Sequence, residues 1–158
     1  MSEAFFYHLT RTGLEPLLAG LLEKSLARNW RVNLRVGDKD RLSWLDERLW
    51  SHPEDSFLPH ACAGQENDSE QPVLLTCGLE NANNADVLIA VDGAGVLPGE
   101  INAFQRVSIV FNGNDEAATQ KARAEWAAIT KAGLPARYWS QGPDGWAETA
   151  SKNVGDTG

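Results

Sequence analysis

The side chains with the greatest capacity for chemistry lie between residues 52 and 62. His52, Asp55, His60 and Cys62 include the donor types that bind zinc and the partners that a cysteine nucleophile needs. Their spacings match none of the usual ligand patterns, and a histidine close to an acidic residue is common in solvated loops. The sequence therefore predicts neither a metal site nor a Cys–His pair, and no catalytic residue is assigned.

A second candidate is the neighbouring carboxylate pair Asp46-Glu47, which lies in a segment with helical periodicity. Consecutive positions on a helix point in different directions, so these two groups cannot flank one reacting atom as an acid–base pair must. We interpret them as part of a solvated helix face.

Glycines after a predicted strand are the nearest approach to a phosphate-binding loop. Asp92-Gly93-Ala94-Gly95 lacks the third glycine of the dinucleotide fingerprint, and no Gly-Lys-Ser/Thr follows anywhere in the chain. Turn residues are the favoured reading of Gly93 and Gly95. A small nucleotide-binding protein or enzyme that uses these strand ends stays as the alternative hypothesis, and no cofactor is predicted.

The elements that would position such groups alternate between the periods of strands and helices. Short segments rich in Val, Ile and Leu predict strands over 4–10, 31–36, 72–76, 86–91, 106–111 and 136–140. Thr12 and Glu15 resemble a capping box ahead of a leucine-rich helix, and further helices are expected to end at Trp50 and to span 115–132. Strands of this kind separated by helices predict an α/β fold, a three-layer Rossmann-like sandwich with a mostly parallel sheet and no nucleotide-binding loop.

Length and composition favour one α/β domain over residues 1–140. The chain has 158 residues, 42% of them hydrophobic, which suffices for one core. From Gln141 it turns to small and polar residues around Trp146, so we expect residues 141–158 to form a flexible tail. The start of the chain lacks the pattern of a signal peptide or a membrane span, which favours a cytoplasmic protein with no membrane partner.

The net charge limits the kinds of binding partner, and the cysteine pattern indicates the state of the thiols. Against 22 Asp and Glu there are 14 Lys and Arg, a formal net charge of -8, so strong direct binding to nucleic acid is not expected beyond a local basic pocket. Cys62 and Cys77 each lack a CxxC neighbour, so both are expected to be free thiols.

The most informative segment carries large apolar side chains with no accompanying catalytic group. Leu42, Leu45 and Leu49 share one face of a predicted helix that ends at Trp50, and Phe57-Leu58 follow between Pro53 and Pro59. We call Trp50, Pro53, Phe57 and Leu58 the aromatic segment. Rigid aromatic groups are typical anchors of protein interfaces, although a small satellite core under a loop would have the same composition.

Five blocks of the sequence together resemble the bacterial DNA polymerase III chi subunit family over about Ala4 to Ala136. The blocks are Phe6-Tyr7-x-Leu9, Trp30-Arg31-Val32, Leu45-Asp46-x-x-Leu49-Trp50, Ser56-Phe57-x-Pro59-His60 and Asp86-Val87-Leu88-Ile89. The resemblance implies a non-catalytic accessory subunit of the DNA polymerase III holoenzyme, a monomer or a 1:1 heterodimer with the psi subunit. Such a subunit couples the clamp loader to single-stranded DNA-binding protein.

The same resemblance implies two binding surfaces. The psi subunit would dock on the aromatic segment, and the acidic C-terminal tail of single-stranded DNA-binding protein, which ends in a Phe carboxylate, would be held by Arg123 and Trp126. These two are three residues apart and so share a helix face, where a guanidinium can take a carboxylate beside an apolar slot. Read without the resemblance, Trp126 would be a core aromatic and Arg123 a solvated charge.

Overall fold

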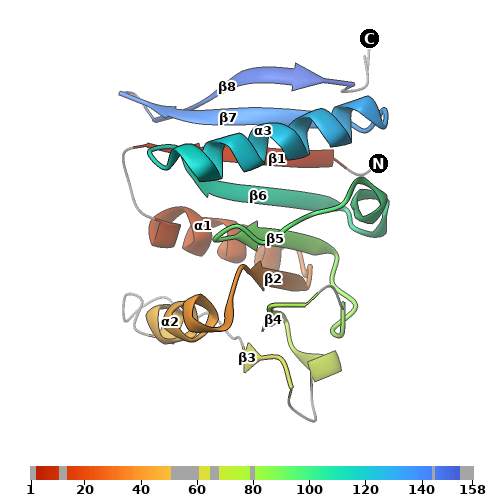
Figure 1. Cartoon of the computed structure of the whole chain (residues 1–158). Coiled ribbons are helices and arrows are strands. Elements are labelled where there is room, and N and C mark those ends of the chain that lie inside the picture. Colours follow the sequence, from red (N-terminus) through yellow and green to blue (C-terminus); the bar gives the residue numbers. More distant parts are fainter. Residues whose placement is uncertain are drawn as a thin grey trace.

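The computed structural model describes residues 3–10, 14–50, 61–64, 68–78, 81–143 and 145–153. Eight strands form one sheet in the order β3-β4-β2-β5-β6-β1-β7-β8 (Figure 1). All neighbouring strands run parallel except β7 and β8, which are antiparallel. The predicted α/β class with a mostly parallel sheet is therefore confirmed. The strands are β1 (Glu3–Leu9), β2 (Val32–Val36), β3 (Ala61–Cys62), β4 (Val73–Thr76), β5 (Val87–Val91), β6 (Arg106–Asn112), β7 (Ala136–Gly142) and β8 (Gly145–Lys152).

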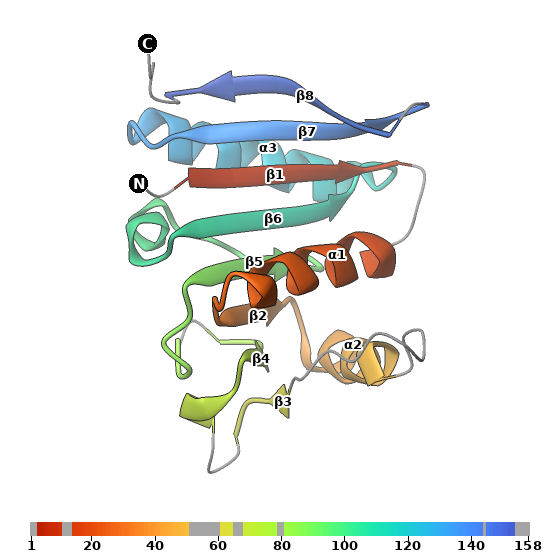
Figure 2. The same ribbon diagram turned by 180° about the vertical axis from the view of Figure 1, so that it is seen from behind.

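Helices cover both faces of the sheet, because the central strands are apolar on both sides. The α-helices are α1 (Leu14–Ala27), α2 (Lys39–Trp50) and α3 (Glu116–Lys131), and the 3-10 helices are η1 (Asp68–Glu70) and η2 (Pro98–Ala103). Leu18 and Leu22 of α1 and Leu45 of α2 pack against one face, the α1 face. Ala122 and Ile129 of α3 pack against the other, the α3 face (Figures 1 and 2).

The alternation along β5 shows how one strand serves both cores. Val87, Ile89 and Val91 belong to the cluster under α1 and α2, whereas Leu88 and Ala90 belong to the cluster under α3. All five are at most 2% exposed. Successive side chains of a strand point to opposite faces, so a continuous apolar run is what a doubly covered strand requires.

Two segments have features that the sequence analysis did not predict. Asn33 and Arg35 alternate with the apolar residues of β2, yet both are buried, and Arg35 is covered by the segment from Gly95 to Glu100 of η2. Residues 145–152, expected to be flexible, form β8 on β7, and Trp146 packs edge-to-face on Tyr7 with ring centroids 5.5 Å apart. The division of the chain into a domain up to residue 140 and a tail stays a prediction.

Candidate functional site

Helix α3 carries Arg123 and Trp126, and its ends are well defined. Asp115 caps the N-terminus, where its carboxylate accepts hydrogen bonds from the backbone N–H groups of Ala117 and Ala118 at 3.0 and 3.3 Å. The alanine-rich interior favours a helix. Gly133 follows the last turn at φ +83°, a conformation that side chains other than glycine rarely adopt. The helix therefore begins and ends at defined residues.

Arg123 and Trp126 lie beside the buried stripe of α3. Ala122 and Ile129 face the sheet and are at most 2% exposed, so Trp126, four residues after Ala122, borders the core. Trp126 is partly buried, and Arg123 is exposed. Arg123 and Trp126 are thus one helical turn apart at the margin of the helix interface, with the guanidinium exposed and the indole partly buried.

The indole of Trp126 is held by two other rings. Its centroid is 5.3 Å from that of Phe6 and 5.8 Å from that of Tyr138, with interplanar angles of 73° and 83°. Edge-to-face packing of this kind fixes a ring at low entropic cost. Trp126 therefore contributes to the core and keeps an exposed part, and its role in ligand binding stays a prediction.

Tyr138 is a component of this site that the sequence analysis did not identify. It is the partner of Phe6 in the β1–β7 register, so it points to the α3 face. Its hydroxyl is 2.6 Å from Nδ1 of His8, burial raises the pKa of the Tyr138 phenol, and the charge of Arg123 opposes that rise. The available signal was the alternation of Ala136, Tyr138 and Ser140, but assigning it to this face needs the strand register.

The arrangement of Arg123, Trp126 and Tyr138 is suited to the recognition of a ligand. A guanidinium next to a half-buried indole can bind a carboxylate while apolar groups contact the rings. Lys131 is exposed in the last turn of the same helix. Lys121, by contrast, donates a hydrogen bond to the Gly93 carbonyl. Arg123 and Lys131 are therefore the α3 cations best placed to attract an acidic ligand.

The aromatic segment falls largely outside the described residues. Trp50 is the last residue of α2, but its side chain is not described, and Pro53, Phe57 and Leu58 lie in the undescribed range 51–60. The helix leading to it forms as predicted, with Leu45 fully buried and Leu42 packed against the same core, whereas the Leu49 side chain lies outside the described ones. The proposed role of the segment stays a prediction.

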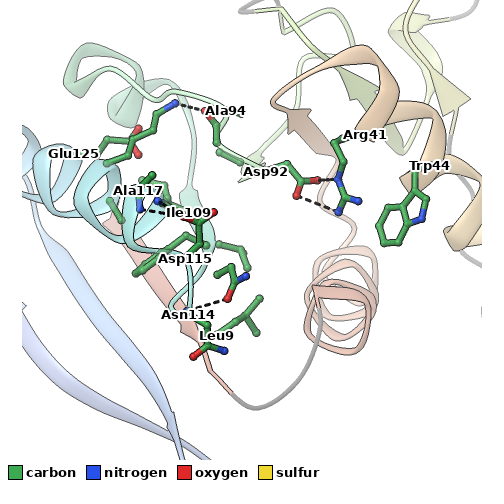
Figure 3. Close-up of a pocket in the computed structure, with 18 residues that line it drawn as sticks. Leu9, Arg41, Trp44, Asp92, Ala94, Ile109, Asn114, Asp115, Ala117 and Glu125 are labelled. Carbon is green, nitrogen blue, oxygen red and sulfur yellow. Dashed lines mark hydrogen bonds and ion pairs between the residues drawn. The ribbon is translucent and has the colours of Figure 1, made fainter.

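A crevice of about 790 Å³ lies at the carboxyl ends of β5, β6 and β1, where the alternative hypothesis placed a nucleotide (Figure 3). Open α/β sheets commonly bind ligands at this edge. Here the polar side chains already have partners within the protein, most of them backbone groups. Arg41 reaches both carboxylate oxygens of Asp92 at 3.2 Å, and its guanidinium stacks 4.0 Å from the ring centroid of Trp44.

The charges of this crevice disfavour a phosphate. The N-terminus of α3, where a phosphate would be expected to bind, is filled by the Asp115 carboxylate. Glu125 also lines the crevice, and it accepts a hydrogen bond from the Val96 N–H at 2.8 Å. Burial raises the pKa of this carboxyl. The geometry therefore gives the nucleotide-binding alternative no support.

Cysteine and metal chemistry find little support in the described part of the chain. Burial and the neighbouring Asp46 raise the pKa of the Cys62 thiol to about 11, which disfavours the nucleophilic thiolate. His52, Asp55 and His60 lie outside the described residues. Among those that are described, no group of three or more His, Cys, Asp or Glu side chains could hold a metal ion, and no helix is long and apolar enough to cross a membrane.

Comparison with known proteins gives a consistent result. A family model described as "DNA polymerase III chi subunit, HolC" matches residues 1–137. The chain is 34% identical over 115 residues to the DNA polymerase III subunit chi of Pseudomonas aeruginosa, an alignment covering 73% of this chain and 78% of the relative. It is 27% identical over 115 residues to the probable DNA polymerase III subunit chi of Rickettsia prowazekii, covering 70% of each.

Proposed function

Because this chain belongs to the DNA polymerase III chi subunit family, we propose that it is a non-catalytic adaptor that links the clamp loader to single-stranded DNA-binding protein. The link to the clamp loader would run through the psi subunit, and the link to single-stranded DNA-binding protein through its acidic C-terminal tail. The observation that carries the proposal is the exposed Arg123 beside the half-buried ring pair of Trp126 and Tyr138.

The tail and this site are chemically complementary. The terminal carboxylate would pair with the Arg123 guanidinium, and the Phe ring would contact the exposed part of the Trp126 indole. Acidic residues upstream of the Phe would be attracted by Lys131. Only cations near the site can provide this attraction, because the chain as a whole carries a net charge of -8.

The helices nearest the two proposed surfaces pack on opposite faces of the sheet. Helix α2, which ends at Trp50, packs on the α1 face through Leu45, whereas α3 packs on the α3 face through Ala122 and Ile129. An adaptor must hold two partners at once, so sites reached from different faces would limit competition between them.

Replacing Phe57 with alanine tests the proposed psi surface. We expect the variant to lose most of its binding to the psi subunit, because truncating an aromatic anchor at an interface centre costs at least about 2 kcal/mol, or roughly 30-fold in affinity. Immobilised psi subunit would capture the wild-type chain and the variant from solutions of equal concentration.

The matched control is Leu97→Ala, which truncates an exposed apolar side chain that is 59% accessible in the loop before η2. The control should bind psi normally. If Phe57→Ala folds, still binds the tail peptide and retains wild-type affinity for psi, the assignment of Phe57 to the psi surface is wrong.

A further inference from the structure

A second, smaller pocket of about 260 Å³ lies on the α1 face, beneath the end of helix α1. Its walls include Leu21, Val87 and Ile89, which make it largely apolar, and Trp30. Val87 and Arg106 are the first residues of β5 and β6, so the pocket opens at the amino ends of these parallel strands. The crevice in Figure 3 lies at the carboxyl ends of the strands, so the two pockets are at opposite ends of β5 and β6.

All charged side chains that line this pocket are basic, although the chain has more acidic than basic residues. Lys24 and Arg28 are four residues apart, as neighbours on one helical face would be, and Arg106 approaches from the sheet. Within the described part of the chain, none of the three forms an ion pair. The pocket is thus a local positive site on an acidic protein.

Aromatic rings, rather than carboxylates, accompany the two arginines. The Arg28 guanidinium carbon is 4.9 Å from the ring centroid of Trp30, and that of Arg106 is 5.8 Å from Trp30 and 4.6 Å from Phe5. Stacking on a ring orients a guanidinium without neutralising it or satisfying its N–H donors. Both side chains therefore keep capacity for an anionic ligand with several acceptor oxygens.

Aromatic side chains continue from this pocket across the sheet. Phe5 and Tyr7 lie along β1 with ring centroids 6.4 Å apart and an interplanar angle of 20°, and Trp146 of β8 packs against Tyr7. Helix α1 lies over β5, between β6 and β2, and leaves this side of β1, β7 and β8 without a helix in the described structure (Figure 2). Trp146 lies beyond residue 137, where the family match ends.

We propose that Lys24, Arg28 and Arg106, together with Trp30 and the Phe5–Tyr7 face, bind a short stretch of single-stranded DNA. Repeated phosphates suit three separated cations, and unstacked bases suit aromatic rings and guanidinium planes. A free nucleotide fits less well, because the pocket is smaller than the roughly 300 Å³ at which small-molecule sites begin. A DNA duplex keeps its bases stacked and would leave the rings unused. This activity is additional to the adaptor role, since the cluster lies on the other face from Arg123.

Fluorescence anisotropy of a labelled oligo(dT) of about 12 nucleotides tests the proposal. With three phosphates neutralised, the logarithm of the affinity should fall with that of the salt concentration at a slope of about -2, a loss of about 20-fold between 50 and 200 mM NaCl. Arg28→Gln and Lys24→Gln should each reduce the slope by about 0.7, and the Lys24→Gln/Arg28→Gln double variant should abolish most of the binding. Both residues are exposed, so the fold should tolerate the changes.

The matched control is Lys39→Gln, which removes the same charge at the start of α2, at the other edge of the sheet. It should leave oligo(dT) binding and its slope unchanged. Equal losses in the control and in Arg28→Gln, or no measurable binding at 50 mM salt, would overturn the proposal.

A parallel titration with the acidic tail peptide separates this inference from the adaptor function. The Lys24→Gln/Arg28→Gln double variant should bind that peptide normally, whereas Arg123→Ala should bind oligo(dT) normally. If the double variant loses the peptide while oligo(dT) does not bind, the cluster is an acidic-peptide site and the DNA assignment is wrong.

Discussion

Replacing Glu100 with glutamine is expected to lower the free energy of unfolding by about 3 kcal/mol. The carboxylate is the counter-ion of Arg35 on β2, whose side chain is only 3% exposed. Two hydrogen bonds join the pair, from Nη1 to Oε2 at 3.0 Å and from Nη2 to Oε1 at 2.8 Å. Removing one partner leaves a buried cation uncompensated, which costs more than the pair itself contributes. Urea denaturation of the wild type and the variant measures the difference.

The expected loss is at the lower end of the range for buried pairs because the Glu100 side chain is 19% exposed, so water can partly replace it. Other groups in the same loop depend on this contact. Arg35 also donates to the Gly95 carbonyl at 2.9 Å, and Glu100 accepts from the Leu97 N–H at 2.8 Å. This loop places Val96 against Glu125 of α3, so the variant should also loosen the helix that carries Arg123.

The Arg35–Glu100 pair should also make the free energy of unfolding depend on pH in the acidic range. Burial alone would raise the pKa of Glu100, but the hydrogen bonds from Arg35 and Leu97 outweigh it and hold the pKa below its usual value of 4.5. The unfolded state therefore binds the proton first, and the stabilisation is present above about pH 4.5 and lost as the pH falls through the lower folded pKa. Glu100→Gln should have a weaker acid dependence in this range.

A double variant provides the control for this prediction. Arg35→Met/Glu100→Leu removes both charges and should recover part of the stability lost in Glu100→Gln, because no unpaired ion remains. A Glu100→Gln protein with wild-type stability, or one destabilised equally at all acidic pH values, would contradict the assigned role of the pair.

Arg123→Ala is expected to weaken binding of the acidic tail peptide by about 30-fold, because a charge-assisted hydrogen bond contributes about 2 kcal/mol. Arg123 is exposed, so this change should not alter the melting temperature. Isothermal titration with a peptide ending in acidic residues and Pro-Phe measures the affinity. An amidated peptide should bind the wild type as weakly as the free acid binds Arg123→Ala, since both lack the same carboxylate–guanidinium contact.

Trp126 needs a more conservative test, because its indole also packs on Phe6 and Tyr138. Trp126→Ala should lose both stability and peptide affinity, whereas Trp126→Phe keeps a ring and should retain the fold with a smaller loss of affinity. The matched control for Arg123→Ala is Arg48→Ala, which removes an exposed arginine from α2. If Arg123→Ala and Arg48→Ala bind the peptide alike, the tail site is not on this face of α3.

Much of the fold could be predicted from the sequence because local patterns determine it. The apolar runs in β5 and β6 predict doubly buried strands, and the Asp115 cap and Gly133 delimit α3. The strand β8 could not be predicted, since it is an exposed edge strand and Trp146 is its one large apolar side chain. Its pairing with β7 depends on a hairpin and on the contact between Trp146 and Tyr7. Neither feature produces a periodic pattern of apolar residues in the sequence.

The candidate site could be predicted only in part, for a similar reason. Arg123 and Trp126 share a helix, so their proximity follows from the spacing. Tyr138 joins them through the pairing of β7 with β1, a contact between residues that are far apart in the chain. The burial of Arg35 could not be predicted from the sequence either, because a polar residue that alternates with apolar ones normally indicates a solvated face.

Capture of single-stranded DNA-binding protein by immobilised psi subunit, with and without this chain, tests the adaptor role most directly. All three proteins should come from the same organism. We predict that single-stranded DNA-binding protein is retained only when this chain is present and only when its own C-terminal tail is intact, and that Arg123→Ala abolishes most of the retention. Retention of the tailless protein to the same extent, or no retention although this chain itself binds psi, would contradict the account.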